Sequence, residues 1–291
     1  MRNIVAIFAF LLSAAFGTQV STASAPVASL AKIRKIAVVS VIGDSLTVKG
    51  ALFVEVPVGR TTRDIEDWKL DDLLEKYIIE KLNDRFVVIP FVSNRRVLWA
   101  AQDESIGDFI NTLGRQLPNT EQPDAYLLVL KFQPRGYYDE RDTKGLILER
   151  HMLWFGSASR PAIIANFTIV LVDAKTRGIL ASQVAHIPPQ GGLKGLYPSE
   201  KIDENSYAAT ASALTSQQMN LLRNEFAQLL SRAADQTLFE VGLVLQAPPP
   251  TTVFVDCVRP DGTKYTIPIT STDTECKEGG RMDTSSGRLL P

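Results

Sequence analysis

Histidine and cysteine are scarce in this chain of 291 residues, which contains two of each. The two histidines, His151 and His186, lie far apart in the sequence and far from both cysteines. Zinc sites need histidine, cysteine or carboxylate ligands at characteristic spacings, so we expect no metal site. No Walker or Rossmann fingerprint follows a predicted strand, so we expect no cofactor either.

Long apolar runs are just as rare, and the one that exists lies at the start. Arg2 precedes the run from Ile4 to Phe16, and Ala23-Ser24-Ala25 follows it. This order is typical of a secretory signal peptide, and the run is shorter than the roughly 20 residues that span a bilayer. The sequence therefore predicts a signal peptide over residues 1–25, and a periplasmic or secreted protein with no membrane span after cleavage.

No cysteine lies in the predicted cleavage region, so we expect no lipid anchor of the lipobox type. Cys257 and Cys276 form an isolated pair near the end of the chain. In an exported protein such a pair predicts a disulfide bond.

No excess of charge of either sign is present. The net charge is −1, or −2 once Arg2 is removed with the signal peptide, and the pI is 6.2. We therefore expect no binding of nucleic acid or of anionic lipid through bulk electrostatics.

The apolar pattern alternates between strand and helix periods. We expect strands at 36–42, 46–56, 86–91, 124–132, 145–155, 163–172 and 179–186. An amphipathic helix is predicted over 64–83 with Asp64 as its cap, a weaker helix over 104–116, and a long helix opened by the capping box Thr215-x-x-Gln218. These elements predict an α/β domain over residues 33–246, with a mixed sheet and covering helices.

A second, smaller unit follows. Residues 247–251 read as a proline-rich linker. Strands at 253–258 and 263–269, joined by the turn Pro260-Asp261-Gly262, predict a β-hairpin that Cys257 and Cys276 close, within residues 252–278. Residues 279–291 are predicted to be a disordered tail.

Gly43-Asp44-Ser45-Leu46 resembles the nucleophile motif of GDSL esterases, whose serine lies on a turn from the first strand into a helix. That family's base is a histidine in an Asp-x-x-His block, which neither histidine of this chain provides. We interpret the tetrad as a two-residue hairpin turn at positions 43 and 44, and expect no catalytic residues. The alternative is a divergent GDSL-type serine hydrolase with Ser45 as nucleophile and His186 as base.

Two loops could bind a partner or ligand. Arg135, Tyr137 and Tyr138, with Trp154 nearby, combine residue types that are common at binding hot spots. The Gly191–Gly195 loop could hold a small anion, so a periplasmic ligand-binding protein is a third hypothesis.

Further segments resemble the α/β domain of bacterial envelope accessory proteins, namely the amino-terminal domain of TolB, CsgG and the lipoprotein activators of penicillin-binding proteins. The likeness is carried by Lys35-Ile-Ala-Val-Val, the helix 73–82 before Phe86-Val-Val-Ile, the strand from Asp124, and the hairpin from Val170 to Leu180. It implies a non-enzymatic envelope protein that acts through contacts with a protein partner.

Overall fold

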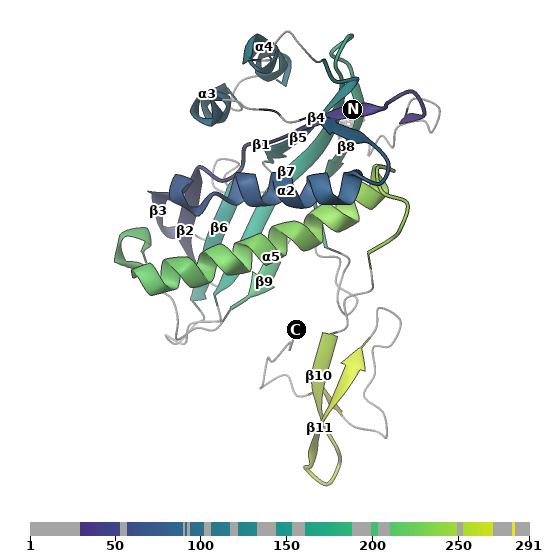
Figure 1. Ribbon diagram of the computed structural model, residues 1–291. Helices are drawn as coiled ribbons and strands as arrows, with labels where there is room; N and C mark the ends of the chain where they lie inside the picture. Colours follow the sequence, from purple (N-terminus) through teal and green to yellow (C-terminus); the bar gives the residue numbers. More distant parts are fainter. Residues whose placement is uncertain are drawn as a thin grey trace, which may run out of the picture.

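The computed structural model (Figure 1) describes residues 30–52, 57–89, 91, 94–101, 106–116, 122–132, 144–152, 161–187, 199–202, 210–248, 253–269 and 281–282. The strands of its main sheet are β1 (Lys35–Ser40), β2 (Ser45–Leu52), β3 (Pro57–Asp64), β4 (Val87–Ile89), β5 (Ala125–Lys131), β6 (Gly145–Met152), β7 (Ala162–Asp173), β8 (Ile179–Val184) and β9 (Ser199–Lys201). The helices are η1 (Glu66–Trp68), α2 (Leu70–Leu82), α3 (Arg95–Ala101), α4 (Ile106–Gln116), η4 (Ala211–Ala213) and α5 (Ser216–Glu240).

The nine strands form one mixed sheet, which confirms the predicted α/β class. β1 pairs in parallel with β4 and β5, and β2 pairs in parallel with β6. β7 runs antiparallel to all four of its neighbours, with β5 and β8 along residues 167–173 and β6 and β9 along residues 162–166. The register thus places β5 and β6 end to end along one edge of β7, and β8 and β9 along the other.

The first two strands also lie end to end. β1 pairs with β5 and β2 pairs with β6, so the chain advances along the sheet between Ser40 and Ser45 and does not reverse. The amide of Val41 still donates to the carbonyl of Val129 (3.0 Å), which continues the β1–β5 ladder past the last residue of β1. The predicted hairpin turn at Gly43-Asp44 is therefore wrong, because strand pairing with β5 and β6 keeps both segments running the same way.

The helices cover the sheet in two separate layers (Figure 1). α2 and α5 lie side by side over one face, where alternate residues of the strands, such as Ile36, Leu127 and Phe167, form the larger core with Leu74 and Phe226. On the other face α3 and α4 cover a smaller core. Its members are fully or nearly buried, and they are Ala37, Val39, Val41, Leu98, Ala101, Phe109, Ile110, Leu113, Tyr126, Leu128, Leu130, Val170 and Val172.

The long helix α5 begins as the sequence predicts. Thr215 Oγ1 accepts from the amide of Gln218 (3.3 Å), and Gln218 Oε1 accepts from the amide of Thr215 (2.9 Å). At about 1.5 Å per residue the helix is nearly 40 Å long. Its contact with α2 includes a hydrogen bond from Tyr77 to Asp235 (2.7 Å).

The structure corrects several predicted boundaries. Residues 57–64 form the edge strand β3, so α2 begins at Leu70 and Asp64 accepts from the amide of Glu66 (2.8 Å), ahead of η1. Helix α3 was not predicted, because its seven residues are too few to show a helical period. α4 agrees with the predicted helix 104–116 over its described residues, since 104 and 105 lie outside them.

A separate three-stranded sheet contains β10 (Val253–Val258), β11 (Lys264–Ile269) and β12 (Arg281–Met282). β10 and β11 pair antiparallel around the predicted turn, in which Gly262 adopts φ 85° and its amide donates to the carbonyl of Arg259 (2.9 Å). β12 pairs with β10, so the predicted tail contains a strand at these two residues. Cys276 lies outside the described residues, and its disulfide with Cys257 stays a prediction.

Candidate functional site

The four residues of the GDSL tetrad occupy the crossing from β1 to β2, and each has a structural contact. A Cβ on Gly43 would lie 3.2 Å from Leu70 Cβ and 3.3 Å from the amide nitrogen of Asp71, so glycine permits the close approach of α2. Asp44 pairs with Lys131 of β5, and its carbonyl accepts from the amide of Ile65 (3.0 Å).

The last two positions of the tetrad belong to β2. Ser45 is the first residue of the strand, and its hydroxyl donates to Asp44 Oδ1 (3.1 Å). Leu46 is fully buried in the larger core. A serine nucleophile needs a base within hydrogen-bond reach and a turn that presents its hydroxyl, whereas Ser45 enters a strand paired on both sides.

Neither histidine comes near Ser45. His186 follows β8, where Nε2 lies 2.9 Å from Glu240 Oε1. β6 and β7 separate β2 from β8, which places His186 about 14 Å from Ser45 at the usual strand spacing. His151 pairs with Ala51, six residues along β2 from Ser45, or about 20 Å away at the usual rise per residue. The sequence alternative of Ser45 with His186 therefore lacks its acid–base contact.

A buried carboxylate lies at the same crossing, at the start of α2. Asp71 is 2% exposed. Its Oδ1 accepts from Ser40 Oγ (2.6 Å) and the amide of Ile42 (2.8 Å), and its Oδ2 accepts from the amide of Gly43 (3.1 Å) and from Trp99 Nε1 (3.0 Å). Four donors and the positive end of α2 stabilise this buried charge.

Arg95, at the start of α3, forms the second part of the cluster. Its guanidinium donates to Glu75 Oε1 (2.8 Å), to Asp72 Oδ1 (2.5 Å) and to the carbonyl of Ser40 (2.8 Å). Glu75 also accepts from the amide of Ser40 (2.7 Å). Burial raises the pKa of the Glu75 carboxyl above its ordinary value, and the hydrogen bond and charge of Arg95 offset that effect in part.

This cluster fills the position at which open α/β sheets commonly bind ligands. β4 and β5 flank β1 on opposite sides, and the connections that lead to them lie on opposite faces of the sheet, so the strand order reverses at β1. Ligands of such sheets bind beyond the carboxyl ends of the strands at this point. Here the side chains of Asp71, Arg95 and Trp99 leave a cavity of about 70 Å³, well below the roughly 300–1,000 Å³ of ligand pockets.

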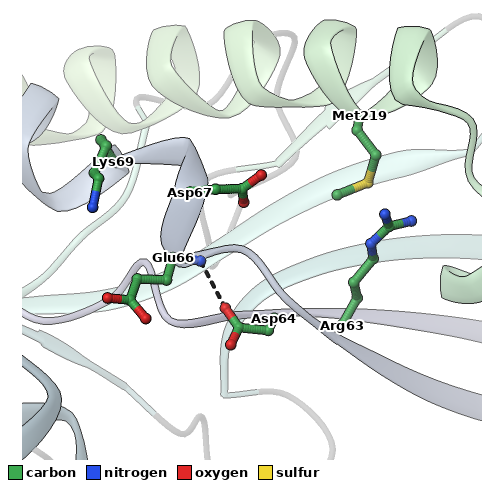
Figure 2. Close-up of a pocket in the computed structure, with 6 residues that line it drawn as sticks. All are labelled: Arg63, Asp64, Glu66, Asp67, Lys69 and Met219. Atoms are coloured by element: carbon green, nitrogen blue, oxygen red, sulfur yellow. Dashed lines mark hydrogen bonds between the residues drawn. The ribbon is translucent and has the colours of Figure 1, made fainter.

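A larger groove of about 580 Å³ lies nearby, between the end of β3, η1 and the first turn of α5. Figure 2 shows Arg63 and Met219 pointing toward the space that Asp67 also faces. Both signs of charge line it, and part of that charge is already paired. Arg63 donates to the carbonyls of Ala211 (3.2 Å) and Leu214 (3.1 Å), and Glu66 pairs with Arg96 (2.7 Å).

Asp71 is the functional candidate that sequence reasoning missed, although a signal exists. It occupies the same face of the helix as Leu74, Ile78 and Leu82, at spacings of three and four residues. An acid on the apolar stripe of a helix predicts a buried carboxylate that needs donors. Its donors come from β1, the crossing and α3, and no local pattern connects those segments.

The predicted binding residues Arg135, Tyr137, Tyr138 and Trp154 lie outside the described residues, as does the Gly191–Gly195 loop. Their flanking strands are described. The amide of Phe132 donates to the carbonyl of Asn166 (3.0 Å), and Gly145 pairs with Asn166. On the other edge of β7, the amide of Ala185 donates to the carbonyl of Phe167 (2.9 Å). The described residues on both sides of 133–143, and those just before 188–198, therefore lie beside Asn166 and Phe167.

Within the described residues, no group of three or more histidine, cysteine or acidic side chains is arranged to hold a metal ion. No helix there has the length and apolar character needed to cross a membrane.

Comparisons with known proteins give no family. No protein-family model matches the chain, and no curated protein does. Among solved structures, hypothetical protein CT253 from Chlamydia trachomatis is 11% identical, over 74% of this chain and 99% of that one, with a TM-score of 0.32. Protein XCC0632 from Xanthomonas campestris, described as DUF330, is 12% identical over 73% and 81%, with a TM-score of 0.29. Likenesses this distant indicate no activity.

Proposed function

We propose that the chain is an exported, non-enzymatic accessory protein of the bacterial envelope that acts through contacts with a protein partner. The observation that carries this proposal is the filled crevice at the carboxyl ends of β1 and β5. Asp71 accepts its four hydrogen bonds from the chain itself, and the remaining cavity of about 70 Å³ is too small for a substrate or nucleotide. The filled crevice therefore favours binding through the protein surface over binding at the carboxyl ends of these strands.

The positions of the described strands that flank residues 133–143 and 188–198 support a contact surface on the sheet. The described residues on both sides of 133–143 lie beside Asn166, on one edge of β7, and Ala185, shortly before 188–198, lies beside Phe167 on the other edge. The segment 133–143 contains Arg135, Tyr137 and Tyr138, whose side-chain types are enriched at binding hot spots. We therefore assign the partner contact to the part of the sheet around Asn166 and Phe167.

Crosslinking in the native envelope, followed by mass spectrometry, tests the proposal. We expect one protein partner to be captured by the wild-type chain and lost from the double variant Tyr137→Ala/Tyr138→Ala, with an unchanged melting temperature. Lys76→Ala, which changes an exposed side chain on α2, should retain the partner. Equal capture by the wild type and the double variant would reject the assigned surface. The same cells report export, since the mature chain should lack residues 1–25.

The hydrolase alternative has its own test. We expect the purified chain to hydrolyse p-nitrophenyl esters no faster than Ser45→Ala and to resist labelling by phenylmethylsulfonyl fluoride, because no imidazole reaches Ser45. Stoichiometric labelling at Ser45 would favour the enzyme.

A further inference from the structure

The two cores of the main domain are separate, which allows one of them to open alone. The larger core lies under α2 and α5, and the smaller one lies under α3 and α4. Buried apolar side chains of the two helices, including Leu98, Phe109 and Leu113, face the sheet only on this second side. Movement of α3 and α4 would therefore expose the smaller core and leave the larger one packed.

Polar contacts hold this pair of helices at two places, because α3 contacts the start of α2 and Asn111 of α4 accepts from Arg177, which follows β7. Trp99 of α3 donates to Asp71, and Arg95 of α3 binds Asp72 and Glu75. The backbone amide of Asn94, just before α3, donates to Gln116 Oε1 of α4 (2.9 Å), which joins the two helices to each other.

Helix α3 depends on these acids for its own stability. Its first two residues, Arg95 and Arg96, put two positive charges at the positive end of a seven-residue helix, which is unfavourable for an isolated helix. Carboxylates of α2 and η1 compensate them, since Arg96 pairs with Glu66 (2.7 Å) and Arg95 with Glu75 (2.8 Å).

We propose that α3 and α4 form a lid that opens as one unit from the second face of the sheet, and that Asp71 is the latch that keeps it closed. Asp71 suits this role because its two oxygens divide their contacts. Oδ1 accepts hydrogen bonds from Ser40 and Ile42, at the end of β1. Oδ2 accepts from Gly43 and from Trp99 of the lid. The latch thus connects the lid to the crossing between β1 and β2.

Hydrogen–deuterium exchange of the full chain, read by mass spectrometry, tests the lid with Asp71→Asn. The amide of asparagine can keep one acceptor oxygen toward Ser40 and Ile42 but presents N–H groups to Gly43 and Trp99. We expect exchange in α3 and α4 to accelerate together by about tenfold or more, the effect of losing a hydrogen bond to a charged group. Exchange in α5 should not change. Asp84→Asn, the same change at an exposed site, should alter neither.

Two further variants keep the test decisive if Asp71→Asn folds poorly. Trp99→Phe removes the indole N–H from the latch and should accelerate the same two helices. In Asp71→Ala, sodium formate should slow the exchange of α3 and α4 again, because formate supplies the missing carboxylate, whereas sodium chloride at equal ionic strength should not. Unchanged exchange in the lid, equal acceleration in α5, acceleration of α3 without α4, or failure of formate would each overturn the proposal.

Discussion

Gly43→Ala tests the close packing between the crossing and α2. The added Cβ would lie 3.2 Å from Asp71 Oδ2, 3.2 Å from Leu70 Cβ and 3.3 Å from the amide nitrogen of Asp71. Two of these atoms belong to the first turn of α2, and the third is fixed by hydrogen bonds from Gly43 and Trp99. Moving any of these atoms would disturb the packing of α2 or its hydrogen bonds. The substitution should therefore act like overpacking of a core, which typically costs about 1–3 kcal/mol of stability.

We expect Gly43→Ala to lower the free energy of unfolding by about 2 kcal/mol, near the middle of that range. For a chain of this size it corresponds to a melting temperature lower by about 4–8 °C. Urea unfolding followed by circular dichroism should show a lower midpoint at an unchanged slope.

Two other glycines provide matched controls, because nothing lies within 4 Å of a Cβ added at Gly59 or Gly114. Gly114→Ala lies within α4 and should stabilise the protein by about 0.5–1 kcal/mol, since alanine favours a helix over glycine. Gly59→Ala, in β3, should change little. A Gly43→Ala protein as stable as the wild type would refute the argument that α2 requires a glycine at this position.

Three other contacts make quantitative predictions. Thr215→Ala should remove the capping box with Gln218 and cost about 1 kcal/mol in urea unfolding. Tyr77→Phe should lose the hydrogen bond to Asp235 and cost about 1.5–3 kcal/mol if the bond has the usual strength of one to a charged group. Because the pKa of Glu75 is raised above 4.5 in the folded protein, the native state binds more protons than the unfolded state just above that pH. The stability of the wild type relative to Glu75→Gln should therefore fall as pH rises through this window, as measured by urea midpoints.

Each of these predictions can fail in a distinct way. A Thr215→Ala protein with wild-type stability would mean that α5 does not need its cap, and a neutral Tyr77→Phe would mean that water replaces Asp235 without loss. A wild-type advantage over Glu75→Gln that grows with pH would show that Arg95 outweighs burial and that the direction of the pKa shift is reversed.

Elements whose residues carry their own pattern could be predicted from the sequence. α5 has both a capping box and a long apolar stripe, and α2 has the stripe. β3 could not be found in this way, because an edge strand with Arg60, Thr62 and Asp64 exposed shows no apolar alternation. The crossing at Gly43 was misread because a two-residue turn and a continuing strand use the same local residues, and only pairing with β5 and β6 distinguishes them.

The site was harder to predict than the fold, for a physical reason. The donors of Asp71 are two backbone amides, a hydroxyl and an indole from three separate segments. Almost any residue type supplies a backbone amide, so a sequence motif cannot show which amides will donate to Asp71. Only the acid on the apolar stripe of α2 was available as a clue.

The position of Asp71 also supports the proposal that the tetrad is not a catalytic motif. A hydrolase stabilises the developing oxyanion with backbone amides and a helix N-terminus. At this crossing the amides of Ile42 and Gly43 already donate to the side chain of Asp71 at the start of α2. A substrate oxyanion would have to displace Asp71 from four donors and bring its own negative charge beside a buried one. The same residues that would serve an esterase therefore hold a structural charge, and the unassisted hydroxyl of Ser45 gains no oxyanion site from them.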